Sequence, residues 1–285
     1  MLLFGYDVYI NTTSPDNKLK SIEVKELDTL LPNNSHTLYF NNNQYRKVSI
    51  TSDKPFNSLS ENQTINFIVE NIVIFSFKKG DSTIFFKLYE EGTEYLVKYW
   101  LTHTFLPIFF TLEDKYYFLH AGAVEIDSKV ILFVANSFGG KSTLTDYFIK
   151  KNHTMLSDDK VAVYEEDKNI IAVPSYPYHR PYRKVEDLGY FVENFAKKNS
   201  EIKYIFNLVK SDSQSDIIIS EIFGLDKFKV LRYSSEIDLP INKNLRFEMI
   251  SKIANKTKVY NITIPWDLDR LEEVYQSIIS FIKKD

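Results

Sequence analysis

Residues 130–134 read Val-Ile-Leu-Phe-Val, residues 135–140 read Ala-Asn-Ser-Phe-Gly-Gly, and Lys141-Ser142-Thr143 follow. An unbroken apolar run with three β-branched residues predicts a fully buried strand of a parallel sheet. Leu144, Tyr147 and Phe148 follow at helical spacing and predict a helix directly after the loop. A small-residue loop that ends in Gly-Lys-Ser between such a strand and helix is typical of a Walker A phosphate-binding loop.

The residue types of this loop suit a nucleoside triphosphate with magnesium. Lys141 would reach the β- and γ-phosphates, Ser142 would place its hydroxyl on Mg²⁺, and the helix N-terminus would face the anion. We therefore expect ATP and Mg²⁺ as cofactors, bound by Ala135, Asn136, Ser137, Phe138, Gly139, Gly140, Lys141, Ser142 and Thr143. Ala135 stands where the motif usually has glycine, and a positive φ there would cost alanine roughly 1 kcal/mol. The plain alternative is an ordinary strand–turn–helix with a surface lysine.

Two aspartates follow the predicted helix and precede a predicted strand at Val161–Tyr164. A P-loop enzyme needs a carboxylate to hold Mg²⁺, and a kinase also needs a base for the acceptor hydroxyl. Asp158 and Asp159 could divide these two roles, which gives Ser142, Asp158 and Asp159 as the predicted metal site. Without the preceding loop the pair would be interpreted as a solvated turn.

His120 ends the apolar run that precedes the P-loop strand. The strand before the P-loop strand could bring His120 to the phosphate end, where it would join Lys141, Asp158 and Asp159 as a catalytic candidate. A structural hydrogen-bonding role is the alternative for a lone histidine at a strand end.

Together these residues resemble the HPr kinase/phosphorylase family and its HPr serine kinase-like relatives. The matching segments are His120–Val124, Ile131–Ser142 and Leu156–Val161, with Val173–Pro177 and Val259–Asp267 also similar. The resemblance covers about residues 99–285. It implies an α/β P-loop kinase core of the HPr kinase type.

The chain departs from that family because no glycine-rich, acidic counterpart of the phosphorolytic segment occurs between Ile171 and Ser211. The resemblance therefore implies ATP-dependent phosphorylation of a hydroxyl group rather than phosphorylase activity. The acceptor stays open between a protein or peptide serine and a sugar or other small molecule. A nucleotide hydrolase and a non-catalytic nucleotide-sensing or partner-binding module are the alternatives.

Composition narrows the class of protein further. The chain has 285 residues, a formal net charge of −3 and no cysteine, which excludes disulfides and thiolate sites. The N-terminus lacks the pattern of a signal peptide, and no apolar run is long enough to span a bilayer, so we expect a cytoplasmic protein. The absence of a basic stripe argues against a nucleic-acid partner. A homo-oligomer remains open.

The chain divides into a β-rich N-terminal domain at residues 1–98 and the P-loop domain at residues 99–285. Five apolar or alternating runs separated by turn residues predict a mostly antiparallel first domain that serves as scaffold or for partner recognition: Leu2–Ile10, His36–Phe40, Arg46–Thr51, Ile65–Phe77 and Thr83–Leu88.

The remaining segments give further structural expectations. Helices are predicted at Tyr95–Leu106, ending before Pro107, at Val185–Ala196 and at Leu268–Lys284. Strands are predicted at Ile202–Leu208 and Ile217–Phe223. The basic and aromatic stretch Tyr178–Lys184 could bind an anion, or it could be a solvated loop with packed tyrosines.

Overall fold

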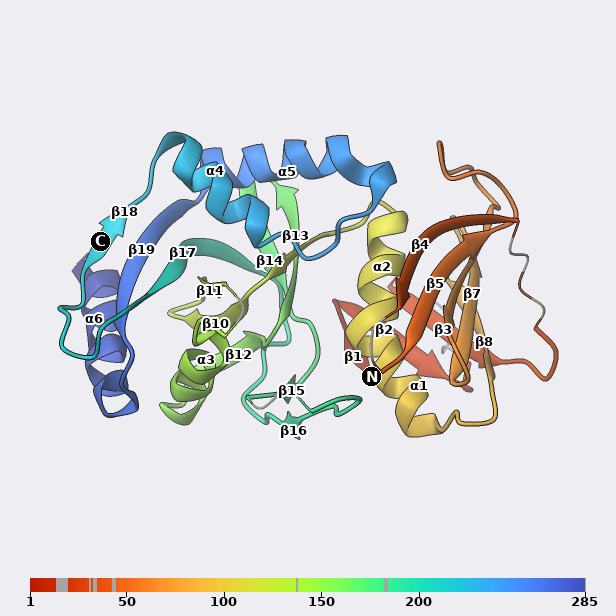
Figure 1. Ribbon diagram of the computed structural model, residues 1–285, viewed down its shortest axis with the longest axis horizontal. Helices are drawn as coiled ribbons and strands as arrows, with labels where there is room; N and C mark the ends of the chain where they lie inside the picture. Colours follow the sequence, from red (N-terminus) through yellow and green to blue (C-terminus); the bar gives the residue numbers. More distant parts are fainter. Residues whose placement is uncertain are drawn as a thin grey trace. The chain divides into compact units, whose positions relative to one another are not determined.

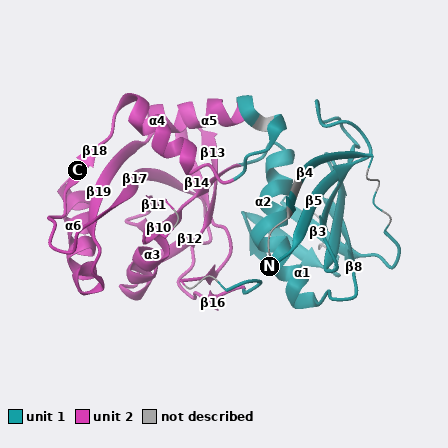
Figure 2. Ribbon diagram, in the orientation of Figure 1, with its two compact units in different colours: residues 1–116, 184–187, 237–244 teal, residues 117–183, 188–236, 245–285 magenta. Residues whose placement is uncertain are grey.

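The chain is mixed α/β with several sheets, and it divides into two compact units (Figure 2). The computed structural model describes residues 1–13, 20–30, 32, 35–42, 45–136, 138–181 and 184–284. Unit 1 comprises Met1–Tyr116, Lys184–Asp187 and Ile237–Asn244, and unit 2 comprises Tyr117–Arg183, Leu188–Glu236 and Leu245–Asp285. The first segment of unit 1 extends to Tyr116. The boundary of a domain near residue 98 stays a prediction.

Unit 1 is built on one sheet, which has eight strands within the described residues, in the order β1-β2-β3-β8-β7-β6-β5-β4 (Figure 1). Its strands are β1 (Leu2–Leu3), β2 (Tyr6–Ile10), β3 (Ser21–Glu26), β4 (His36–Asn42), β5 (Lys47–Ser52), β6 (Thr64–Val69), β7 (Val73–Lys78) and β8 (Thr83–Leu88). β3 pairs in parallel with β2 and with β8, and the other pairs are antiparallel. The run predicted at 65–77 is a hairpin of two strands.

A continuous helical segment packs on this sheet: α1 (Glu94–Trp100), the π-helical turn η1 (Leu101–Phe105) and α2 (Leu106–Leu112). The prediction that the helix ends before Pro107 was wrong. Pro107 lies in the first turn of α2, directly after the wider π turn, and the helical segment continues through it to Leu112. Phe105 stacks on Phe75 with 4.7 Å between ring centroids, which fixes the segment on the sheet.

Unit 2 contains a second sheet with nine strands among the described residues (Figure 1). The main path runs β12-β10-β11-β17-β14-β13-β9, and β19 pairs with β17 and β18. The strands are β9 (Tyr117–His120), β10 (Gly122–Ile126), β11 (Lys129–Val134), β12 (Thr154–Ser157), β13 (Lys160–Glu166), β14 (Asn169–Val173), β17 (Ser200–Ser211), β18 (Ile219–Glu221) and β19 (Lys258–Pro265); a small hairpin joins β15 (Tyr178–His179) and β16 (Tyr190–Phe191).

Two apolar cores cover the faces of this sheet because residues of β11 alternate between them. Val130, Leu132 and Val134 belong to the core that includes residues of α4 (Gly224–Tyr233) and α5 (Lys243–Lys256). Ile131 and Phe133 belong to the core that includes residues of α3 (Lys141–Lys150) and α6 (Leu271–Lys284). The short 3₁₀ turns η2 (Pro240–Asn242) and η3 (Leu268–Arg270) precede α5 and α6.

The helix predicted at Val185–Ala196 was wrong, because Glu186 and Gly189 have positive φ angles that a right-handed helix excludes. Residues of this stretch form turns and β16 instead. The helices α4 and α5 and the strand β3 were not predicted. Among the described residues, no helix has both the length and the apolar character needed to cross a bilayer.

Candidate functional site

The predicted phosphate-binding segment forms a strand, a loop and a helix in unit 2. β11 ends at Val134, and α3 begins at Lys141 with Gly140 as its N-cap at φ +87°. Gly140 offers no side-chain acceptor to the first N–H groups of α3. Such helix N-termini bind anions through their open N–H groups and the positive end of the helix dipole.

Steric contacts within the loop explain its residue choices. Ala135 does not have a positive φ, so its replacement of glycine costs no backbone strain. A Cβ at Gly139 would lie 2.6 Å from the Ala135 Cβ and 2.8 Å from the Asn136 carbonyl oxygen, which requires glycine there. Phe138 has φ +60° and is 96% exposed. Ser137 lies outside the described residues.

Lys141 is buried, and its ammonium donates a hydrogen bond to the Ala135 carbonyl oxygen at 3.2 Å. The Lys141 side chain therefore lies over the loop with which it would bind phosphate. Ser142 is half-buried and Thr143 exposed on the first turn of α3.

Strand pairing brings the other predicted residues to the same edge of the sheet. Gly122 pairs with Phe133, near the carboxyl end of β11, so His120 and Ala121 lie toward the loop end. β12 pairs with β10 through Ser157 and Ala123, which puts Asp158 at this edge as well. A Cβ at Gly122 would lie 2.0 Å from the Thr145 hydroxyl, so glycine permits the close approach of α3 to β10.

Asp158 is almost fully buried, and both of its carboxylate oxygens accept hydrogen bonds. The His179 ring Nδ1 lies 2.6 Å from Oδ1, and the Arg180 backbone N–H donates to Oδ2 at 2.9 Å. His179 is itself buried, and its Nε2 lies 3.6 Å from the Asp146 carboxylate on α3. Two residues of the Tyr178–Lys184 stretch thus hold the Asp158 carboxylate in one orientation. Tyr182 and Arg183 of that stretch lie outside the described residues.

Asp159 belongs to a second cluster, with His120 and Glu236. The His120 Nδ1 lies 3.1 Å from Asp159 Oδ1 and 3.2 Å from Glu236 Oε2. The Arg180 guanidinium lies 3.7 Å from Asp159 Oδ2, and Lys160 forms an ion pair with Glu236. His120, Asp159 and Glu236 each offer an atom within 4.8 Å of the others.

These contacts shift the protonation equilibria of the second cluster. Burial lowers the pKa of His120, but hydrogen bonds and charges from Asp159 and Glu236 outweigh it, so the His120 pKa is raised. Burial alone would raise the pKa of Glu236, whereas Lys160 and His120 lower it overall. The charged forms of His120 and Glu236 are therefore favoured together.

Glu236 and His179 were missed by sequence reasoning. Glu236 follows α4, more than 100 residues after His120, and it reaches the site because the segment after α4 lies along β9. The His120 N–H donates to the Ser234 carbonyl at 2.6 Å and the Glu236 N–H to the Phe118 carbonyl at 3.0 Å. No local motif marks this contact. His179 lies within the stretch predicted to bind anions, but nothing in the spacing pairs it with Asp158.

The donors at this edge fit a triphosphate and a magnesium ion. The uncapped helix start and the buried Lys141 suit phosphate oxygens. Ser142 and a carboxylate of the Asp158–Asp159 pair offer the oxygen ligands that Mg²⁺ prefers.

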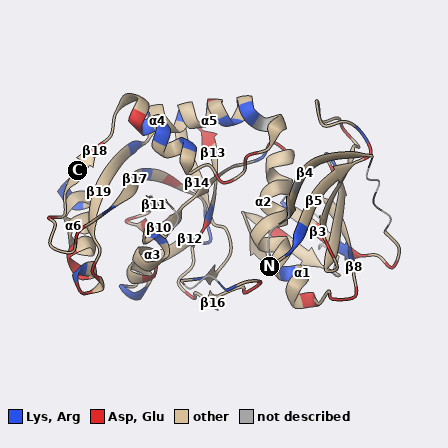
Figure 3. Ribbon diagram, in the orientation of Figure 1, with Lys and Arg blue, Asp and Glu red and all other residues tan. Residues whose placement is uncertain are grey.

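Figure 3 shows basic and acidic residues interspersed along unit 2, with basic residues most frequent on α4 and α5.

The chain has little similarity to known proteins. No family model matches the chain, and no curated protein does either. One solved structure with some similarity is the Hpr(Ser) kinase/phosphatase from Coxiella burnetii, at 15% identity over 58% of this chain and 98% of that chain, with a TM-score of 0.36.

Proposed function

We propose that the chain is an ATP- and Mg²⁺-dependent phosphotransferase that phosphorylates a hydroxyl group, with a P-loop core in unit 2. The observation that carries this proposal is the Gly-Lys-Ser loop between β11 and α3 at the edge that also holds the Asp158–Asp159 pair. Phosphoryl transfer needs mainly positioning and charge neutralisation, which these groups can provide.

In this proposal the loop amides, Lys141 and the start of α3 hold the phosphates. The ammonium of Lys141 would exchange its bond to the Ala135 carbonyl for phosphate oxygens. Because the Ala135 carbonyl belongs to the loop itself, the ammonium already lies against the segment that would hold the phosphates.

The two aspartates take different roles. Asp158, oriented by His179 and the Arg180 N–H, resembles metal-binding carboxylates, which are themselves usually hydrogen-bonded. Ser142 and Asp158 would therefore hold Mg²⁺, which when bound would neutralise charge on the phosphate oxygens.

Asp159 then serves as the proton acceptor. The acceptor oxygen forms a bond to the γ-phosphorus, the bond from that phosphorus to the β–γ bridging oxygen breaks, and the hydroxyl proton passes to Asp159. The products are ADP and the phosphorylated acceptor. His120, whose raised pKa favours the imidazolium, would stabilise negative charge near the transferred group.

An acceptor-dependence assay tests the proposal. With γ-labelled ATP and Mg²⁺, we expect label on a serine-containing protein or peptide, or on a sugar, and its loss in Asp159→Asn. Asp167→Asn, at an exposed turn of unit 2, is the matched control and should behave as wild type. Label recovered only as inorganic phosphate would identify a hydrolase, and absence of both turnover and binding would refute the proposal.

A further inference from the structure

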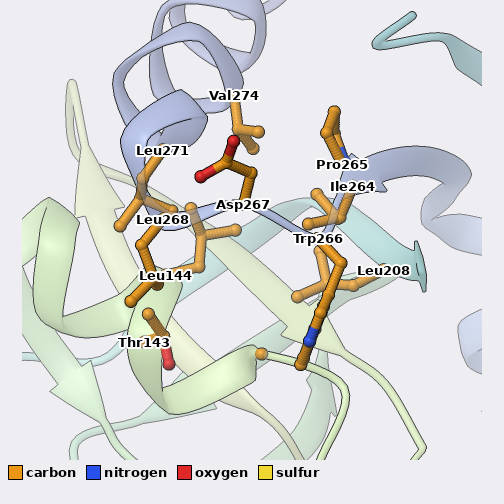
Figure 4. Close-up of a pocket in the computed structure, with 11 residues that line it drawn as sticks. Thr143, Leu144, Leu208, Ile264, Pro265, Trp266, Asp267, Leu268, Leu271 and Val274 are labelled. Atoms are coloured by element: carbon orange, nitrogen blue, oxygen red, sulfur yellow. The ribbon is translucent and has the colours of Figure 1, made fainter. Parts of the chain in front are cut away.

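A pocket of about 220 Å³ lies in unit 2 next to the start of α3 (Figure 4). Gly140, Thr143 and Leu144 line it from the loop end and α3, and Trp266 lines it from the residues after β19. Most other lining residues are aliphatic side chains of β17, β19, η3 and α6. Gly140 and Thr143 thus belong both to this pocket and to the predicted phosphate-binding segment.

Trp266 is the distinctive side chain of the pocket. Its indole extends toward the loop in Figure 4, and the nearest atom to a Cβ built at Gly140 is the Trp266 Cζ3, at 3.7 Å. Trp266 is 46% exposed, although tryptophan is highly buried on average in folded proteins. Lys210, which does not line the pocket, lies 4.0 Å from the ring centroid and holds the indole by a cation–π contact.

The volume and the lining of the pocket suit a planar aromatic ring rather than a whole ligand. Its volume is below the ~300–1,000 Å³ of pockets that enclose drug-sized molecules. Polar side chains in its wall are few, and the Asp267 carboxylate already accepts a hydrogen bond from the Asp269 N–H at 3.0 Å. Burial and stacking, not hydrogen bonding, would therefore provide most of the affinity.

We infer that this pocket binds the nucleobase of the nucleotide whose phosphates the 135–142 loop holds, with Trp266 as its stacking surface. The inference rests on the proposed function, because it needs the triphosphate at the loop. It assigns a base-binding role to the chain after β19, which contributes nothing to phosphate binding.

Calorimetric titrations with Mg²⁺ and either a non-hydrolysable ATP analogue or inorganic tripolyphosphate separate the two sites. Stacking on an aromatic side chain is worth about 1–3 kcal/mol, so we expect Trp266→Ala to weaken the ATP analogue by roughly 5- to 150-fold. Tripolyphosphate affinity should stay unchanged, and Trp266→Phe should retain most of the ATP affinity. Phe223→Ala, which removes an exposed aromatic elsewhere in unit 2, is the matched control and should have no effect.

Tryptophan fluorescence gives a second readout that does not depend on the alanine variant, because the chain has only Trp100 and Trp266. The ATP analogue should quench fluorescence in wild type and in Trp100→Phe, but not in Trp266→Phe. Unchanged ATP affinity in Trp266→Ala, equal loss of ATP and tripolyphosphate, or quenching that persists in Trp266→Phe would overturn the inference. Absence of binding of either ligand to the wild type would refute the proposed function together with it.

Discussion

At the scale of single residues, the main feature of unit 2 is the concentration of charge at one edge of its sheet. Asp158 is 3% exposed and Asp159 8% exposed, and each contacts a histidine. Burying a charge costs free energy, and the attraction between paired charges does little more than offset that cost. Such a cluster therefore adds little net stability. Its pairing is consistent with a chemical role for these groups.

The two aspartates should respond differently to the same change. In Asp159→Asn we expect ATP turnover to fall by ~10²–10⁴-fold, as for a lost general base, while Mg²⁺·ATP affinity is retained. In Asp158→Asn the amide NH₂ would face the donors of His179 or Arg180, so both Mg²⁺ dependence and thermal stability should be impaired. Steady-state rates, calorimetry and melting curves distinguish these patterns; near-wild-type rates in both variants would refute the assignment.

The raised pKa of His120 predicts how the free energy of unfolding depends on pH. A folded-state pKa above the ordinary 6.5 means that the charged imidazole contributes stability fully below that value and loses it as pH rises through the folded-state pKa. The difference in free energy of unfolding between wild type and His120→Gln should thus shrink as pH increases from 6 to 9. The groups facing His120 are Asp159 and Glu236, with Lys160 and Arg180 next to them. Denaturant titrations across this range are the measurement, and a difference that grows with pH would contradict the account.

At the scale of elements, the loop between β11 and α3 combines two unusual positions. Phe138 adopts a positive φ without being glycine, which costs an L-residue about 1–2 kcal/mol, and Gly139 has no room for a side chain. Strain of this kind tends to occur at ligand-binding loops. The loop shape therefore depends on Gly139 more than on the residue at 135.

Gly139→Ala should disturb this loop directly. Its Cβ would overlap Ala135 and the Asn136 carbonyl, so we expect a loss of about 1–3 kcal/mol in the free energy of unfolding. Nucleotide affinity should fall as well. Gly224→Ala is the control: the φ of +56° is unfavourable for alanine there, but the space is open, so stability should fall with nucleotide affinity unchanged. Chemical denaturation and calorimetry measure both quantities, and wild-type affinity in Gly139→Ala would argue against a phosphate-binding loop.

The elements with strong apolar patterns were predictable, whereas those fixed by tertiary contacts were not. The run at 130–134 and the helical spacing after Lys141 correspond to β11 and α3. The alternation of β3, with Ile22 and Val24 buried, was present in the sequence and overlooked. The error at Val185–Ala196 arose because residues with positive φ are not visible in an apolar pattern. Glu236 joins His120 only through backbone pairing after α4, which no local sequence feature specifies.

At the scale of the whole molecule, the two compact units are interleaved along the chain. Unit 1 includes the short segment Lys184–Asp187, within which Glu186 contacts residues distant in sequence. The Arg46 guanidinium donates to Glu186 at 3.0 Å and also to Glu91 at 2.9 Å, and the Trp100 indole N–H donates to Glu186 at 3.0 Å. These bonds attach the segment to unit 1.

A double-mutant cycle at Arg46 and Glu186 should reveal this attachment. The two side chains are 25% and 15% exposed, so we expect a coupling of about 0.5–3 kcal/mol in the free energy of unfolding. The pair Lys47 and Glu70 is the control: at 3.5 Å and largely exposed, it should couple by only ~0–1 kcal/mol. Equal coupling energies for the two pairs would show that the segment is held by other contacts.

Calorimetric titration with Mg²⁺ and a non-hydrolysable ATP analogue tests most directly whether the 135–142 loop binds a nucleoside triphosphate. We predict saturable, Mg²⁺-dependent binding by wild type and by Lys283→Ala, whose lysine is exposed on α6. Lys141→Ala should lose most of this affinity, because it removes the buried ammonium that lies over the loop. No detectable heat with wild type at millimolar nucleotide, or undiminished binding by Lys141→Ala, would contradict the central claim.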